Sequence, residues 1–262
     1  MVRKPMCKPF LVPLDKEEAA AAEDTAAFRV IWMARCKTKL SAFVFSSSTG
    51  QWRAAAPKAW TDLVVDKGDS DYMSQVPHIV LRRHYAYGCF YWDWLLTNRK
   101  KLLVLDTRRM EFSMADFPPG EWIMRGLAIV ETGEGRVGMF GFHGTTLSYT
   151  VARNKGDDPS QWQTVKRISL DSGYKYYIKV ATESCLLLRK TGENSPLENP
   201  LNEFFSMDIK TETSSLENPL TEYFSIDVKT FKFHRFCAQG TDMYWKHIYT
   251  NFPPSFLSSP TI

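Results

Sequence analysis

The chain has 262 residues, and its 33 Lys and Arg against 29 Asp and Glu leave a net charge of +4. This weak excess argues against nucleic acid as the main partner, because phosphate-driven binding needs a concentrated basic face. With 44% hydrophobic and 14% aromatic residues, the chain is too apolar to be disordered and long enough to bury a substantial core. The aromatic content, with 14 Gly and 14 Pro, favours strands joined by turns.

We expect no secretory signal peptide, because prolines interrupt the short apolar run near the start of the sequence. No apolar run approaches the roughly 18 residues that a membrane helix needs, so we expect no membrane partner. The five cysteines (Cys7, Cys36, Cys89, Cys185 and Cys237) are scattered and form no CxxC pair. This usage favours a reducing, intracellular setting in the cytoplasm or nucleus.

The first 27 residues differ from the rest of the chain. They hold Pro5, Pro9 and Pro13, a charged cluster and a short alanine run. We predict a flexible N-terminal tail over 1–27 and a folded domain over 28–262.

Short apolar runs separated by Gly, Ser, Asp and Pro predict strands from residue 28 onward. In chain order they are Phe28–Met33, Leu40–Phe45, Gln51–Ala54, Tyr87–Trp92, Leu102–Leu105, Met110–Met114, Leu127–Glu131, Val137–Phe142, Thr146–Ala152, Trp162–Ile168, Tyr176–Val180, Cys185–Leu188, Phe224–Lys229 and Phe231–Phe236. No segment longer than about a dozen residues has a 3.6-residue apolar period. The predicted class is all-β.

These strands recur in units. Each unit has a polar turn followed by a strand that opens on an aromatic residue: Trp52, Phe112, Trp162 and Phe231, spaced by 60, 50 and 69 residues. Near-regular units of about 40–50 residues are typical of a β-propeller with kelch-like blades of four antiparallel strands. A meandering β-sandwich is the alternative.

A tandem duplication explains the longest spacing. Residues 195–211 and 214–230 are identical at 12 of 17 positions at an offset of 19, and subtracting 19 from 69 leaves 50. Within the duplication, 195–213 and 214–232, we predict that the second copy supplies the blade strand, because it runs directly into the strand at Phe231. The first copy would be an extended loop or an edge hairpin, which loop-closure entropy tolerates.

Several segments, taken in order, resemble the plant F-box-associated family. They are Leu40–Trp52, Ala86–Trp92, Lys101–Ser113, Val130–Arg136, Phe224–Thr230 and Tyr249–Ser255. The resemblance covers about 28–262. It implies a β-propeller-like region that selects protein substrates, downstream of an F-box that docks onto the linker subunit of a cullin–RING ubiquitin ligase.

The sequence departs from this family at its start. Residues 1–27 contain neither the Leu-Pro nor the amphipathic helices of an F-box. We therefore expect the docking half to be missing and the propeller to be incomplete, with an exposed edge.

No cofactor, metal or catalytic set is predicted. Gly133–Gly138 matches GxGxxG, but the strand-like residues on both sides favour a hairpin turn over a dinucleotide site. The five histidines never fall at metal-ligand spacing. Asp66, Asp69 and Asp71 lack the ligand order of an EF-hand, which favours a solvated loop. We predict that the chain is not an enzyme.

Two aromatic–basic stretches are the candidate recognition sites. One is a predicted inter-strand loop with Trp94, Arg99 and Lys100, and the other contains Arg82 and Arg83. Trp, Tyr and Arg dominate interface hot spots, and basic residues would favour an acidic partner. His143 is a further candidate, with an ordinary structural role as the alternative.

The predicted function is protein recognition, as the substrate-binding part of an F-box adaptor of an SCF-type ubiquitin ligase. The partner is a protein substrate, and the linker and cullin subunits join only if an F-box is supplied. The alternative is a stand-alone propeller binding module with no ligase role.

Overall fold

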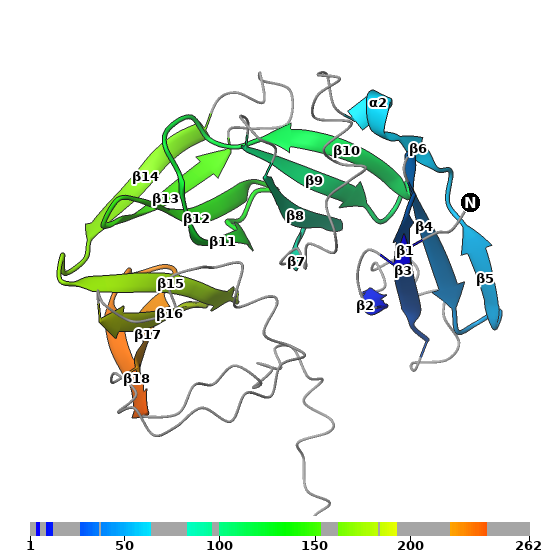
Figure 1. Ribbon diagram of the computed structural model, residues 1–262. Helices are drawn as coiled ribbons and strands as arrows, with labels where there is room; N and C mark the ends of the chain where they lie inside the picture. The colour runs from blue at the N-terminus through cyan, green and yellow to red at the C-terminus, as the bar shows by residue number, and fades with distance from the viewer. Residues whose placement is uncertain are drawn as a thin grey trace, which may run out of the picture. The chain divides into compact units, whose positions relative to one another are not determined.

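The structure is a computed structural model that describes residues 4–5, 9–12, 27–36, 38–63, 83–95, 100–152, 162–182, 184–192 and 221–239. Its strands form four antiparallel sheets in chain order (Figure 1). The prediction of an all-β fold made of propeller-like blades is confirmed. Within the described part of the chain, no helix has the length and hydrophobicity of a membrane span.

The first sheet has the order β1-β3-β4-β5, with β2 also paired to β3 and β6 also paired to β4. Its elements are β1 (Lys4–Pro5), β2 (Phe10–Val12), β3 (Arg29–Arg35), β4 (Lys39–Ser46), β5 (Gln51–Ala54) and β6 (Lys58–Ala59), followed by the short helix α2 (Trp60–Leu63).

The N-terminal segment corrects one prediction. Strand β2 lies inside the predicted tail, yet Phe10 and Val12 are 5% and 4% exposed and belong to the core. Alternation in a strand lets two apolar residues reach the core from a segment that is otherwise rich in proline and charge. The tail prediction is therefore wrong for residues 10–12.

The other three sheets each have four strands that follow one another in sequence: β10-β9-β8-β7, β11-β12-β13-β14 and β15-β16-β17-β18. Their strands are β7 (Arg83–Ala86), β8 (Cys89–Leu95), β9 (Lys100–Asp106), β10 (Glu111–Asp116), β11 (Ile123–Glu131), β12 (Val137–His143), β13 (Thr146–Ala152), β14 (Trp162–Ser169), β15 (Tyr174–Ala181), β16 (Cys185–Gly192), β17 (Thr221–Asp227) and β18 (Phe233–Gln239). The four predicted units correspond to the four sheets.

The chain divides into two compact units, and each is described by itself. The first unit comprises Met1–Gly120, Glu131–Gly138 and Thr150–Thr164, and the second comprises Glu121–Val130, Met139–Tyr149 and Val165–Ile262. The core of the first unit includes Ile31, Leu40, Trp60, Trp92 and Leu103. In the second unit, Ile178, Leu186, Leu188 and Ile226 are at most 1% exposed.

One turn recurs in three of the sheets and shows their common construction. The fourth residue after the end of the preceding strand has a positive φ in each case: Gly50 (63°), Met110 (54°) and Phe231 (57°). At two of these turns an aspartate closes the loop, because Asp106 and Asp227 each accept hydrogen bonds from the backbone N–H groups two and three residues later. Such Asx geometry stabilises a turn locally.

The structure of this turn also corrects the predicted start of the last strand. Phe231 is not the opening residue of a strand, because its positive φ places it within the turn. The strand begins at Phe233, which lies two residues after the left-handed position, as Trp52 follows Gly50 and Phe112 follows Met110. A non-glycine residue in this conformation is unusual, and local sequence pattern does not reveal it.

The duplicated segment contributes one strand to the fourth sheet. Strand β17 belongs to the second copy and lies between β16 and β18. Its Ile226 pairs with Leu186 and Phe233 and is fully buried. The prediction that the second copy fills the blade is confirmed, while the first copy lies outside the described residues.

Candidate protein-recognition surface

The structure places Arg83 at the start of β7 in the first unit. Its guanidinium carbon lies 4.2 Å from the centroid of the Phe10 ring and 5.7 Å from that of Phe90. The side chain is exposed, and it covers buried aromatic rings through cation–π contacts. This geometry gives Arg83 a packing role.

His143 lies at the end of β12 in the second unit. Its ring centroid is 3.9 Å from that of Trp122, a side chain that is 6% exposed. His143 therefore packs against the blade and is half-buried. Arg83 belongs to the first unit and His143 to the second.

The other predicted site residues are described only in part. Trp94 lies in β8, opposite Lys101 of β9, so the predicted loop begins later than expected. Lys100 lies in β9 opposite Leu95. Arg82 and Arg99 lie outside the described residues.

The GxGxxG segment forms the predicted hairpin turn between β11 and β12. Gly133, Glu134 and Gly135 all have positive φ, at 86°, 52° and 71°. The Gly133 N–H donates a 2.8 Å hydrogen bond to the Tyr87 hydroxyl oxygen, and the Tyr87 N–H donates to the Glu131 carboxylate at 2.6 Å. These two hydrogen bonds connect the turn at Tyr87 with the turn at Gly133 in the first unit.

Among the described residues, no group of three or more His, Cys, Asp or Glu side chains is placed to hold a metal ion. Asp66, Asp69 and Asp71 lie outside the described residues.

The outer face of the first sheet is unusually apolar. The strand register places Leu11 beside Val30, Val30 beside Phe45, and Phe45 beside Trp52, which forms one row across β2, β3, β4 and β5. Leu11 is 66% exposed and Trp52 is 52% exposed. In antiparallel sheets with one buried face, the other face is normally polar. This row is therefore a candidate interaction surface.

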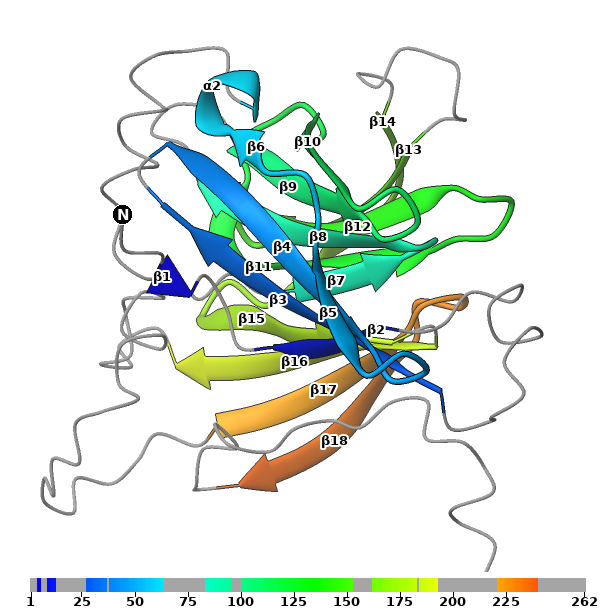
Figure 2. The same ribbon diagram turned by 90° about the vertical axis from the view of Figure 1, so that its right-hand side faces the viewer.

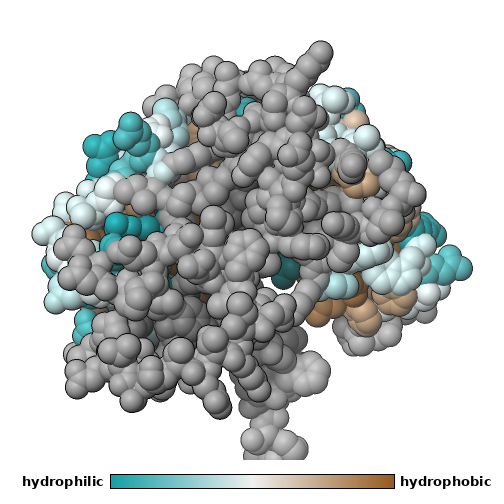
Figure 3. Space-filling model, in the orientation of Figure 1, coloured by the Kyte–Doolittle hydropathy of each residue, from teal (hydrophilic) through white to brown (hydrophobic). Residues whose placement is uncertain are grey.

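A second row broadens the surface. Trp32 pairs with Phe43, and their ring centroids are 5.2 Å apart. Phe28 is 43% exposed and lies 6.2 Å from Phe45, centroid to centroid. We call these side chains the aromatic face; its members are Leu11, Phe28, Val30, Trp32, Phe43, Phe45 and Trp52. Hydrophobic surface is visible at the lower right of Figure 3, where Figure 1 draws this sheet.

Strand β5 ends the sheet beside this face. All four of its residues are exposed, and within the described ranges it pairs only with β4. Figures 1 and 2 show β5 running along β4. The aromatic face thus meets an open strand edge.

The sequence that forms β3 to β6 carries charge of one sign. Residues 28–60 contain six basic residues and no acidic ones: Arg29, Arg35, Lys37, Lys39, Arg53 and Lys58. Arg53 lies on the edge strand and is exposed. Arg53 pairs with Val44, so it lies on the sheet face opposite the row of Phe45 and Trp52. A partner strand along β5 would meet the aromatic row on one face and Arg53 on the other, which suits an acidic protein partner.

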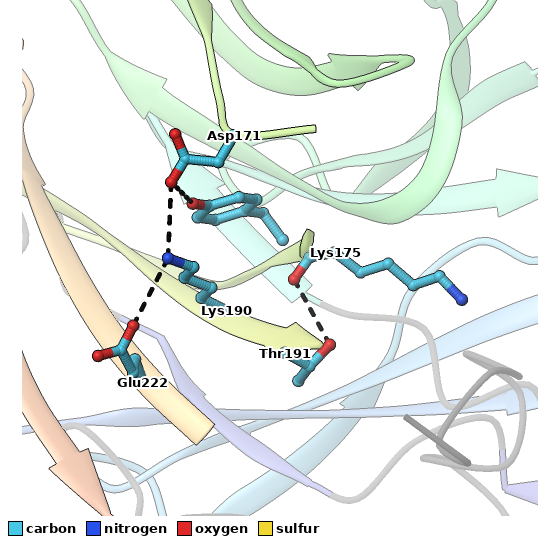
Figure 4. A network of polar contacts seen from close by, with 6 residues as sticks. Asp171, Lys175, Lys190, Thr191 and Glu222 are labelled. Atoms are coloured by element: carbon cyan, nitrogen blue, oxygen red, sulfur yellow. Dashed lines mark hydrogen bonds and ion pairs between the residues drawn. The ribbon is translucent and has the colours of Figure 1, made fainter. Parts of the chain in front are cut away.

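In contrast to the apolar aromatic face, the fourth sheet carries a network of ion pairs and hydrogen bonds around Lys190 (Figure 4). The Lys190 ammonium group lies 3.5 Å from Asp171 and 3.6 Å from Glu222, and 3.7 Å from the centroid of the Tyr174 ring. The Tyr176 hydroxyl donates to Asp171 at 3.4 Å.

The pKa shifts in this network reflect its packing. Burial lowers the pKa of Lys190, but electrostatic interactions, the largest with Tyr176 and the next with Glu222, outweigh that effect and the net shift is upward. Burial also raises the pKa of Tyr176, and nearby Lys190 opposes this. Because the ion pairs and ring contacts join β15, β16 and β17, we assign the network a stabilising role within the second unit.

Comparisons with known proteins leave the family open. No protein-family model matches the chain, and no curated protein matches its sequence. A solved structure described as a "putative 6-phosphogluconolactonase" from Bacteroides uniformis is 11% identical over 90% of this chain and 72% of that one, with a TM-score of 0.35. A likeness this distant carries no conclusion about activity or partners.

Sequence reasoning missed the aromatic face. Two signals were available: the absence of acidic residues over 28–60, and the alternation of aromatic residues in Phe28–Trp32 and Phe43–Phe45. Alternation identifies one face of a strand, but only the sheet register shows that Leu11 and Trp52 lie on that same face.

Proposed function

We propose that this chain is a protein-recognition module that resembles the substrate-binding part of an F-box adaptor of an SCF-type ubiquitin ligase. In this proposal it binds a protein partner and catalyses no reaction on it. The F-box-associated motifs support the proposal, and so does the blade-like arrangement of strands in each sheet.

The exposed aromatic face is the observation that carries the recognition role. Leu11 and Trp52 leave more than half of their side-chain surface in water, at the two ends of one apolar row. Exposed apolar side chains that adjoin each other on a regular surface mark interaction sites, and tryptophan is enriched among the residues that dominate binding energy.

Affinity capture from a plant cell extract tests the recognition role. The tagged full chain is compared with a Leu11→Ser/Trp52→Ser variant and with Val165→Ser, which alters a side chain of similar exposure (54%) on β14. We expect the double variant to lose specific partners that the Val165→Ser variant retains. Retention of every partner by the double variant would exclude the aromatic face as the recognition surface.

The same samples test the ligase role separately. Linker and cullin subunits among the captured proteins would support an adaptor. Their absence, with substrate capture intact, would favour the stand-alone binding module.

A further inference from the structure

We propose that the open edge of β5 accepts an extended, acidic segment of the partner protein as an added strand. This inference rests on the proposed function and names the chemistry of the partner. The segment would lie along β5 and carry apolar side chains at alternate positions.

The backbone of β5 is suited to strand addition. Its residues pair with β4 in the register Phe45 to Trp52 and Val44 to Arg53, and all four are exposed. In an antiparallel ladder, alternate residues direct their N–H and C=O groups away from the paired strand. Strand addition satisfies such groups through main-chain hydrogen bonds, which are insensitive to partner sequence.

The edge has two of the features that protect natural sheet edges, a short strand and the charge of Arg53, but it has neither proline nor a run of charges. Gln51–Ala54 contains no proline and no aspartate or glutamate, and its only charge is Arg53. Proteins usually blunt such edges with charges, prolines or bulges. Among the described strands β5 pairs only with β4, and such an edge beside exposed aromatic side chains is suited to a partner strand.

The register defines where the partner needs apolar side chains. A residue placed opposite Trp52 on an added strand would extend the row of Val30, Phe45 and Trp52 by one strand. The next residue along would face away from this row, because side chains alternate across a strand. Apolar residues at every second position therefore match the surface.

The basic charge of this chain predicts acidic residues at the remaining positions of the partner segment. The same charge disfavours pairing with a second copy of this chain. Residues 28–60 contain six basic residues and no acidic one, and Arg53 is the charge on β5 itself. An acidic segment would be attracted to them, whereas two copies paired through β5 would bring like charges together.

Binding of synthetic peptides to the full chain tests the proposal by fluorescence anisotropy. The first probe is a labelled peptide in which Glu alternates with Phe and Val, and the second has Lys in place of each Glu. Two further acidic probes carry N-methyl groups on the odd or on the even residues, and each blocks hydrogen bonding along one edge of the peptide. All four probes have the same length.

We expect the acidic probe to bind at least about tenfold more tightly than the lysine probe, and to weaken as salt rises. One N-methylated probe should lose binding while the other retains it, because an added strand uses one of its edges. Trp52→Ser should weaken binding about tenfold, and Val165→Ser should leave it unchanged.

Several outcomes would overturn the inference: equal binding of the acidic and lysine probes, equal binding of both N-methylated probes, or no binding of the acidic probe. Concentration-dependent dimerisation that is lost in the Trp52→Ser variant would instead identify a second copy as the occupant of the edge.

If the peptides do not bind while the Leu11→Ser/Trp52→Ser variant still loses its captured partners, strand addition is wrong and protein recognition stands. If the peptides bind but no partner depends on the aromatic face, the proposed function is the part that fails.

Discussion

Trp52 lies directly opposite Phe45 in the register of β4 and β5, and the two ring centroids are 5.5 Å apart. The pair has the geometry of a core contact, although Trp52 is 52% exposed. Cross-strand aromatic pairs stabilise a sheet even at its surface. The side chain thus combines a modest structural role with accessibility to a partner.

The stability effects of two tryptophans should separate these roles. Trp52→Ala should lower the free energy of unfolding by about 0.5–1.5 kcal/mol, the contribution of an aromatic pair. Trp92→Ala should lower it by about 3–5 kcal/mol, because Trp92 is 1% exposed and lies in the core. Urea denaturation measures both. Equal losses would mean that Trp52 is a core residue and would remove the basis of the recognition surface.

The turn at Asp227 should make the fourth sheet sensitive to acid. Hydrogen bonds, the largest from the backbone N–H of Thr230, hold the pKa of the Asp227 carboxyl below its ordinary value of 3.8. The ionised form therefore stabilises the folded state above the ordinary pKa, and this stabilisation is lost as the pH falls through the lower folded pKa.

Thermal unfolding of wild-type protein and Asp227→Asn across acid pH tests this sign. The wild-type advantage should be constant above pH 3.8 and should shrink below it. An advantage that grows on acidification would contradict the assigned hydrogen bonds.

Gly141 on β12 is required by a close approach. A Cβ atom at this position would lie 2.6 Å from Cε3 of Trp122, a side chain that is 6% exposed and packs on His143. Gly141→Ala should therefore destabilise the protein by about 1–3 kcal/mol and change the NMR shifts of the His143 ring.

Gly173→Ala is the matched control, because nothing lies within 4 Å of the added methyl group. It should be neutral or stabilise by up to about 1 kcal/mol, through the unfolded state. If both variants unfold at the same denaturant concentration, the contact between Gly141 and Trp122 does not constrain the sheet.

Lys190 should be the most sensitive residue of the network in the fourth sheet. Its side chain is 12% exposed, and Lys190→Met would leave the partly buried Glu222 without that cation. We expect a loss of about 1–3 kcal/mol in denaturant unfolding. Lys175→Met is the control, since its ammonium group points away from the network while its backbone carbonyl accepts from Thr191 (Figure 4).

The pH dependence of this loss has a definite sign. The pKa of Lys190 is raised above 10.5, so its stabilising effect is complete below that value and disappears as the pH rises through the folded pKa. The difference between wild-type protein and Lys190→Met should therefore shrink only at strongly alkaline pH. A difference that vanishes at neutral pH would show that ion pairing is not its cause.

The duplication allows a direct comparison of two deletions of equal length. Removal of 195–213 keeps β17 and its turn, so the melting temperature should change little. Removal of 214–232 would force the first copy to supply the strand, with Asp208 in place of Asp227 and Glu212 in place of Phe231.

The second deletion should be the more destabilising. Phe231 packs on Tyr149 with ring centroids 5.6 Å apart, and a charged residue does not replace that contact. Circular dichroism melts compare the two proteins. A larger drop after removal of 195–213 would show that the first copy, and not the second, supports the blade.

Strand positions were predictable because their causes are local. Alternating apolar residues, with polar turns between them, identified all four sheets and the strand supplied by the second copy. The Gly133 turn was also predictable, since two glycines separated by one residue between apolar runs favour positive φ. These features depend on residues within a few positions of one another.

Burial and exposure were decided by the tertiary structure. Phe10 enters the core and Leu11 remains exposed because β2 pairs with β3, a contact between segments about 20 residues apart. The hydrogen bond from Gly133 to Tyr87 spans 46 residues. Sequence alternation separates the two faces of a strand, but which face is covered depends on distant segments that pack against it. For that reason, composition and spacing determined that this is an all-β protein of repeated sheets, while the aromatic face and the open edge of β5 emerged only from the register of the folded strands.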